Sequence, residues 1–152
     1  MKPIEFQCEQ KTNKSSTTLC HEITNVSLWS DFDGYWMLPG IESANYDKKT
    51  NGLIGSRIRV LNSDGSRHIE EIIDWQEGIK ISLKMHHFSA PLNKLSTHFI
   101  EQWYFKGNKS NCTVVRKFSL YPKNQLTRPL LWLISLLLRK AIQKHLIAIS
   151  IA

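Results

Sequence analysis

The final 25 residues, from Arg128 to Ala152, constrain the fold most, because they carry a long apolar helix pattern after a body composed mainly of strand patterns. The stretch Pro129–Leu138 is as apolar as half of a membrane span. A span needs about 20 consecutive apolar residues, and this stretch is stopped by Arg139 and Lys140 and interrupted again at Gln143. The sequence therefore predicts a helix too short to cross a bilayer, with a broad apolar surface that the preceding sheet covers.

The rest of the chain alternates apolar and polar residues between turn signals. A strand is predicted over Ile4–Glu9, followed by helical spacing from Leu19 to Trp29 with Thr17 or Thr18 as the N-cap. From Ile41 onward the period is two, and turn residues separate about six strands. The predicted turns are 49–52, 62–65, 76–78, 89–94 and 106–111. One strand, one or two short helices, a run of antiparallel strands and a helix that starts near 125–129 are typical of an α+β domain. With 152 residues and no linker, we expect a single domain over residues 1–152.

Charge and cysteine content limit the classes of function. The formal net charge is +7, but the 20 basic residues are spread without a block, which favours a solvated surface over a nucleic-acid face. Cys8, Cys20 and Cys112 have no metal-binding spacing, so we expect neither a metal site nor a disulfide framework, and no cofactor. The first residues lack the apolar core of a signal peptide, which predicts a cytoplasmic location.

Folding the strands about their turns predicts one concave apolar face. In the last hairpin this register pairs Trp103 with Val114, and it places Glu101 opposite Arg116. In the preceding hairpin it directs Ile69, Glu71 and Ile73 to the same face and pairs Ile73 with Ile81. Glu71 then lies opposite Ser56 on one side and Leu83 on the other, with no cationic partner.

These polar residues have two interpretations. They line a cavity, where solvent or a ligand lowers the cost of burying charge, or Glu101 and Arg116 form a buried ion pair that only specifies register. Trp36 and Trp103 are the tryptophans that we expect in a cavity wall. The helix should direct its apolar face to the sheet, through Leu130, Leu133, Ile134, Leu137, Leu138, Ala141 and Ile142. The candidate ligand-contacting residues are Trp36, Ser56, Ile58, Glu71, Leu83, Met85, Glu101, Trp103, Arg116, Phe118, Leu133 and Leu137.

The order of elements resembles that of a known superfamily. The residues that carry the resemblance are Val26–Phe32, Trp36–Ile41, Gly55–Val60, Glu70–Ile73 and the helix start Arg128–Leu131. They are similar to the START-like (SRPBCC) helix-grip superfamily, which includes the birch pollen allergen, and within it to the polyketide cyclase/dehydrase and lipid transport proteins. The resemblance implies a curved antiparallel sheet of about seven strands that grips the C-terminal helix, with two short helices after the first strand. It also implies an elongated cavity for lipids, sterols, polyketides or quinones, and it assigns no catalytic residue.

Three functions remain open at this point. The first is an intracellular carrier or sensor of a hydrophobic small molecule. The second is a cyclase/dehydrase-like enzyme that uses Glu71 or Glu101 as general acid or base, with Arg116 stabilising an enolate. The third is an accessory factor that docks on a membrane or a protein through the apolar segment Leu146–Ala152, which also leaves the oligomeric state open.

Overall fold

The structure is a computed structural model that describes residues 1–108 and 111–151. In it a seven-stranded antiparallel sheet is combined with one long C-terminal helix and short helices after the first strand, as predicted. The strand order is β1-β7-β6-β5-β4-β3-β2. The elements are β1 Ile4–Lys11, α1 Ser16–Thr24, η1 Val26–Asp31, β2 Ile41–Lys48, β3 Arg57–Asn62, β4 Arg67–Gln76, β5 Lys80–His86, η2 Leu92–Lys94, β6 Ser96–Asn108, β7 Asn111–Pro122 and α2 Arg128–Ser150.

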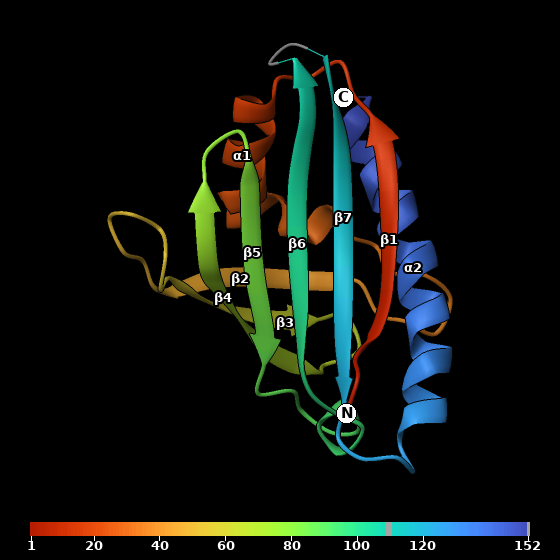
Figure 1. Ribbon diagram of the computed structural model, residues 1–152. Helices are drawn as coiled ribbons and strands as arrows, with labels where there is room; N and C mark the ends of the chain where they lie inside the picture. Colours follow the sequence, from red (N-terminus) through yellow and green to blue (C-terminus); the bar gives the residue numbers. More distant parts are fainter. Residues whose placement is uncertain (109–110, 152) are drawn as a thin grey trace.

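The sheet is strongly curved. Figure 1 shows β5, β6, β7 and β1 side by side in front, whereas β2 and β3 run across behind them. The helix α2 lies along the edge that β1 forms, and α1 lies behind the sheet. The antiparallel strands therefore wrap around an interior that α2 closes on one side only.

Helix α2 has three different faces. Leu131, Leu138, Ile142 and Leu146 are buried and belong to the hydrophobic core, as the i, i+4 and i+7 spacing of one helix face allows.

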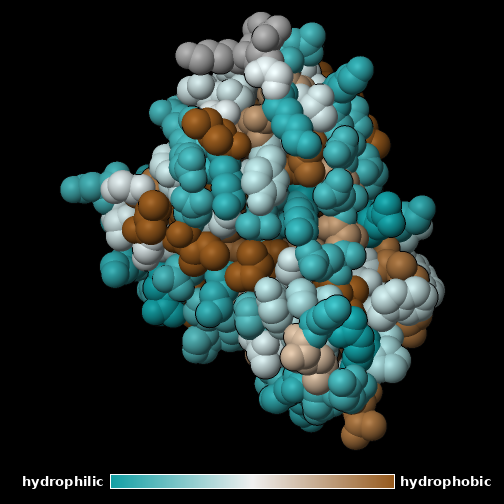
Figure 2. All heavy atoms as spheres, viewed as in Figure 1, coloured by the Kyte–Doolittle hydropathy of each residue, from teal (hydrophilic) through white to brown (hydrophobic). Residues whose placement is uncertain are grey.

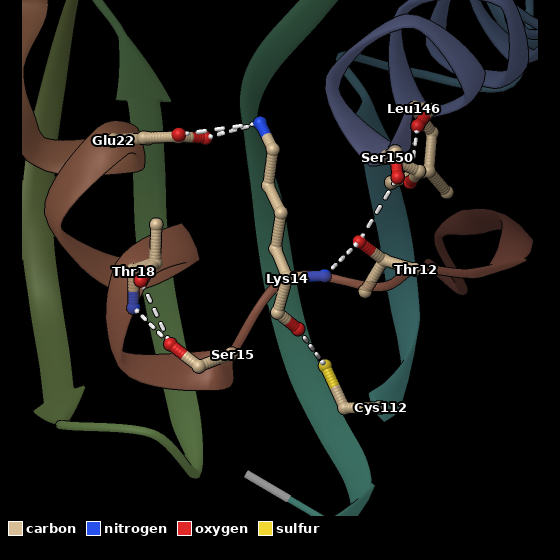
Figure 3. Close-up of polar contacts among 8 residues, drawn as sticks. All are labelled: Thr12, Lys14, Ser15, Thr18, Glu22, Cys112, Leu146 and Ser150. Carbon is tan, nitrogen blue, oxygen red and sulfur yellow. Dashed lines mark hydrogen bonds and ion pairs between the residues drawn. The ribbon is translucent and has the colours of Figure 1, made fainter. Parts of the chain in front are cut away.

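At the C-terminal end of α2, Thr12 Oγ1 donates a hydrogen bond to the Ser150 carbonyl oxygen at 3.1 Å (Figure 3), which ties the helix to the end of β1. Within the described residues, no helix has an apolar stretch long enough to cross a membrane.

The other two faces of the helix are exposed. Leu130 and Leu133 face the sheet side, as predicted, but they are 50% and 52% exposed because a hollow separates them from the sheet. Trp132 and Leu136 are 50% and 43% exposed and do not line that hollow. The helix is therefore displaced towards β1 instead of lying flat over the sheet.

Helix α1 closes one end of this hollow. Its N-cap is Ser15, whose hydroxyl accepts a hydrogen bond from the Thr18 N–H at 3.1 Å, so the predicted caps Thr17 and Thr18 are wrong. The sequence offers four consecutive Ser and Thr residues that could all cap, and only the place where β1 ends selects among them. Lys14 Nζ, which follows β1, lies 3.1 Å from Glu22 Oε2 on α1 (Figure 3).

For the last hairpin, the predicted register places each residue on the correct side of the sheet but gives it the wrong partner on the neighbouring strand. Trp103 pairs with Arg116 and Glu101 with Phe118, two residues away from the prediction. A shift of two preserves the side to which each residue points. The inward set Phe99, Glu101, Trp103, Arg116 and Phe118 is therefore as predicted.

The predicted register of strand β4 is wrong by one residue over most of its length. Ile58 pairs with Glu70 and not with the predicted Ile69. On the other side of β4, the prediction paired Ile73 with Ile81, but it is Ile72 that pairs with a buried residue of β5, Leu83. A bulge between Ile72 and Asp74 restores the predicted side at Trp75. The alternation of an Ile-Glu-Glu-Ile-Ile sequence fits both registers, and an added residue in a strand leaves no signal that alternation can detect.

Candidate functional site

A cavity of about 910 Å³ lies between the concave face of the sheet and α2. Its volume is within the range of sites for drug-sized ligands. Apolar side chains from the sheet, the segment after η1 and α2 form most of its wall. They include Leu38, Met85, Phe99, Phe118, Leu133 and Leu137.

Eight of the twelve candidate residues line this cavity. They come from β5, β6, β7 and α2, and they are Leu83, Met85, Glu101, Trp103, Arg116, Phe118, Leu133 and Leu137. The four that do not line it come from the loop after η1 and from the β3 and β4 region. They are Trp36, Ser56, Ile58 and Glu71.

Trp36 is not a wall residue because of the turn that carries it. Tyr35 and Leu38 exchange two backbone hydrogen bonds of 3.0 and 2.9 Å, so Trp36 and Met37 form the tip between them. Trp36 has φ +49° and is 80% exposed. The residue of this segment that the hydrophobic core contacts is Leu38.

Glu71 points to the opposite side of the sheet because of the register of β4. Its cross-strand neighbours are Arg57 and Lys84, and its Oε2 lies 3.5 Å from His86 Nε2. Glu71 is therefore an outer-face carboxylate with basic neighbours and has no contact with the cavity.

Ser56 and Ile58 were predicted to line the cavity, but both are fully buried in structural contacts and do not line it. Ser56 Oγ accepts a hydrogen bond of 2.9 Å from the Thr50 N–H, which holds the loop before β3. Ile58 is fully buried in the hydrophobic core. Both residues lie where β3 has turned away from α2, and periodicity along a strand does not report where a sheet bends.

One polar part of the cavity wall is the buried ion pair between Glu101 and Arg116. Arg116 donates hydrogen bonds to Glu101 Oε2 from Nε at 3.1 Å and from Nη2, and both side chains are buried. The predicted pair is confirmed, although it joins diagonal and not directly opposite residues. The Arg116 guanidinium also lies 4.0 Å from the centroid of the Trp103 ring, a cation–π contact. Desolvation raises the pKa of Glu101, while the Arg116 charge opposes that rise.

His145 of α2 extends this pair across the cavity. Arg116 Nη1 lies 3.0 Å from His145 Nδ1. Guanidinium groups only donate, so Nδ1 accepts and the ring proton of neutral His145 is on Nε2. Burial and the nearby charge of Arg116 lower the pKa of His145 to about 3, which keeps the ring neutral. Among the described residues, Nε2 has no hydrogen-bond partner, and His145 lines the cavity.

A second buried pair, which the sequence analysis missed, lies on β4. His68 Nε2 is 2.9 Å from Glu70 Oε2; both side chains are mostly buried and both residues line the cavity. The correct register of β4 would have placed Glu70 inward. His145 shares the helix face of Leu138 and Ile142, seven and three residues before it, and this spacing is the sequence signal that directs its side chain inward.

The most buried polar side chains of the wall are therefore two carboxylates, one guanidinium and two imidazoles, whereas the other charged residues that line the cavity, such as Glu22, Asp31, Asp64 and Arg67, are more exposed. Such a wall can orient a ligand that has a hydrogen-bonding group at one end and an apolar body. Most donors and acceptors of this wall already bind one another. His145 Nε2–H and the buried Trp103 Nε1–H are donors for which the described residues provide no acceptor.

Comparisons with known proteins identify the fold. No protein-family model matches the chain, and no curated protein matches its sequence. Solved structures do match over nearly the whole chain. A START superfamily protein from Mycobacterium smegmatis has a TM-score of 0.73 and 10% identity, with 96% of each chain covered. The Zhui aromatase/cyclase from a Streptomyces species has a TM-score of 0.71 and 9% identity and covers 97% of this chain and 93% of its own.

A plant protein shows the same likeness at full length. The ginseng major latex-like protein 151 from Panax ginseng has a TM-score of 0.68 and 13% identity, with 100% of each chain covered. At these identities the comparisons establish the architecture. The chain has the helix-grip fold that these solved structures share, and this is the fold that the resemblance in its sequence implied.

Proposed function

We propose that the protein binds a hydrophobic small molecule in the cavity between the sheet and α2. The observation that carries this proposal is a hollow of about 910 Å³ whose wall is mainly apolar and includes two buried polar pairs. Packed interiors leave few voids larger than a water molecule, so a hollow of this size is a cost that a ligand offsets. The fold shared with START and latex-like proteins supports the same conclusion.

The ligand is an apolar molecule with a hydrogen-bond acceptor such as a carbonyl or ester oxygen. Lipids, quinones and aromatic polyketides all have this chemistry. Arg116 and His145 would hold the polar end beside Glu101 and Trp103. The apolar body would contact Leu83, Met85, Phe118, Leu133 and Leu137. In this role the protein is a carrier or sensor, with the cytoplasm as its expected location.

The first experiment is native mass spectrometry for a co-purified molecule, followed by a thermal-shift screen of lipids, quinones and polyketides. A ligand at 100 times its Kd stabilises the folded state by about 2.7 kcal/mol. For a chain of this size that is a rise in Tm of roughly 5–10 °C. A broad screen with no shift and no co-purified molecule would contradict the proposal.

A matched pair of variants tests the location. Leu133→Trp fills the cavity from α2 and should abolish the ligand-induced shift, while the free protein stays folded. Leu136→Trp adds the same volume outside the cavity, at a residue that is 43% exposed, and should leave the shift intact. Equal loss of binding in both variants would place the ligand elsewhere.

A second candidate function is catalysis on the bound molecule. It is favoured by Glu101, a carboxylate on the cavity wall whose pKa burial raises. The bond to Arg116 engages one of its oxygens, so Glu101 would first have to release this partner to exchange a proton. The discriminating test is recovery of the ligand: a binding protein returns it chemically unchanged after prolonged incubation, and an enzyme does not.

A further inference from the structure

The outer face of α2 carries exposed apolar side chains that no part of the described chain covers. Trp132 and Leu136 are 50% and 43% exposed, and their i, i+4 spacing places them on one stripe. Leu126, just before the helix, is 91% exposed. Figure 2 shows hydrophobic side chains at the surface along the edge that α2 forms, and a further hydrophobic group among hydrophilic side chains on the face of the sheet.

Basic residues border the same stripe. Arg128, Arg139 and Lys140 lie within one turn of Trp132 or Leu136 along the helix, and neither Arg139 nor Lys140 forms an ion pair within the described residues. Arg128 donates a hydrogen bond to the Lys2 carbonyl oxygen, which adds the start of the chain to this region. The stripe thus combines apolar and cationic side chains.

The sequence contains a matching asymmetry of charge. None of the 13 Asp and Glu residues follows Glu101, whereas nine of the 20 Lys and Arg residues do. The formal charge is therefore +9 after Glu101 and −2 over residues 1–101, which contain 11 basic residues and all 13 acidic ones. Helix α2 itself contains no acidic residue. Of the four basic residues of α2, Arg128, Arg139 and Lys140 border the apolar stripe, and Lys144 lies near Asp33.

We propose that this stripe of α2 docks on the surface of an anionic lipid bilayer. An amphipathic helix with apolar and basic side chains binds in the interfacial plane, through apolar burial and attraction to anionic lipid together. The positive charge of the stripe complements an anionic surface. Its apolar side chains can insert into a bilayer, whereas a simple polyanion has no apolar interior to receive them. Leu133, beside Trp132 in sequence, lines the cavity, so docking would place the cavity wall next to the bilayer.

The test is flotation of the full chain with vesicles of phosphatidylcholine alone and with about one third phosphatidylglycerol. Binding is expected only with the anionic vesicles and should weaken as salt rises. Each basic residue near the surface contributes about a factor of five. The double variant Arg139→Glu/Lys140→Glu should therefore lose at least tenfold in affinity. Trp132→Ser should lose affinity on the order of tenfold, because its ring no longer inserts.

Matched controls separate this surface from net charge and general hydrophobicity. Lys48→Glu/Lys49→Glu makes the same change in charge at the end of β2, and Ile79→Ser removes an apolar side chain that is 62% exposed in the β4–β5 turn. Both should bind like the unmodified protein. Equal losses in the controls and in the α2 variants would overturn the proposal.

Two further outcomes also overturn it. If charge reversal weakens binding but Trp132→Ser does not, the attraction is non-specific adsorption to a charged surface. If the protein binds nucleic acid through Arg139 and Lys140 and ignores the vesicles, the partner is a different polyanion. The proposal does not rest on the cavity having a ligand. Thermal shift in lipid-free buffer tests ligand binding separately, and Arg139→Glu/Lys140→Glu should leave that shift unchanged.

Discussion

Arg116 on β7 donates a hydrogen bond of 3.0 Å to His145 on α2, across the cavity wall. This contact joins the sheet to the gripped helix at a place where α2 otherwise leaves a hollow. The same guanidinium binds Glu101, so the three residues form one polar unit that links β6, β7 and α2.

The first prediction concerns the dependence of stability on pH. The pKa of His145 is about 3 in the folded protein and near 6.5 in the unfolded chain, so the unfolded state binds more protons between these values. The free energy of unfolding should fall as pH is lowered through this window, by about 1.4 kcal/mol per pH unit from this residue. His145→Asn keeps an acceptor for Arg116 and removes the titration.

The measurement is urea unfolding at pH 7, 6, 5 and 4 for both proteins. The pKa values of His86 and His98 are also lowered by burial and contribute with the same sign in both, so the difference isolates His145. Parallel curves for the two proteins would contradict a buried neutral imidazole.

The second prediction concerns the Glu101–Arg116 pair. Arg116→Met leaves the carboxylate of Glu101 buried without its partner and should lower the free energy of unfolding by about 3–5 kcal/mol. The double variant Glu101→Met/Arg116→Met removes both charges and should be neutral or more stable by about 1–4 kcal/mol. Equal destabilisation of the single and double variants would show that the pair itself, and not the orphaned charge, determines stability.

The double variant also bears on function. If the ion pair only specifies register, the stable double variant should still bind ligand with unchanged affinity. If the pair orients the ligand, as proposed, the thermal shift should be lost although the protein remains folded. Measuring stability and ligand shift on the same sample separates the two roles.

The third prediction compares adjacent carboxylates on β4. Glu70→Ala removes the partner of the buried His68 and should cost about 1–3 kcal/mol. Glu71→Ala changes a partly exposed contact with His86 and should stay within about 0.5 kcal/mol. Thermal unfolding of both variants checks the register directly, because the earlier pattern-based register predicts the reverse order.

The fourth prediction concerns the turn that carries Trp36. Trp36→Ser should leave stability within about 0.5 kcal/mol and ligand binding unchanged, because the ring is mostly in solvent. Gly34→Ala should cost about 2–4 kcal/mol, since Gly34 has φ +76° and a Cβ there would lie 2.2 Å from the Leu38 carbonyl oxygen. Loss of ligand binding in Trp36→Ser would restore Trp36 as a cavity residue.

Some features of the site follow from sequence patterns and others do not. Trp103, Arg116 and Phe118 were placed on the inner face because the two strands of their hairpin alternate cleanly, and that face survives a shift of two residues. Glu70 was missed because two adjacent glutamates flanked by isoleucines fit either face of the strand. The bulge after Ile72 shifts the register, so the pairing at the β4–β5 turn does not determine which face Glu70 occupies.

The sequence by itself determined the order of strands and helices, the terminal helix as the covering element and the inward set of β6 and β7. These features follow from the local periodicity of apolar residues and from turn residues, both of which are contained in short stretches of sequence. Only the tertiary structure decided that α2 sits towards β1, that a cavity remains beside it, and that His145 meets Arg116 there. The reason is that sheet curvature and helix placement are set by the packing of many distant side chains at once, and no local pattern records that sum.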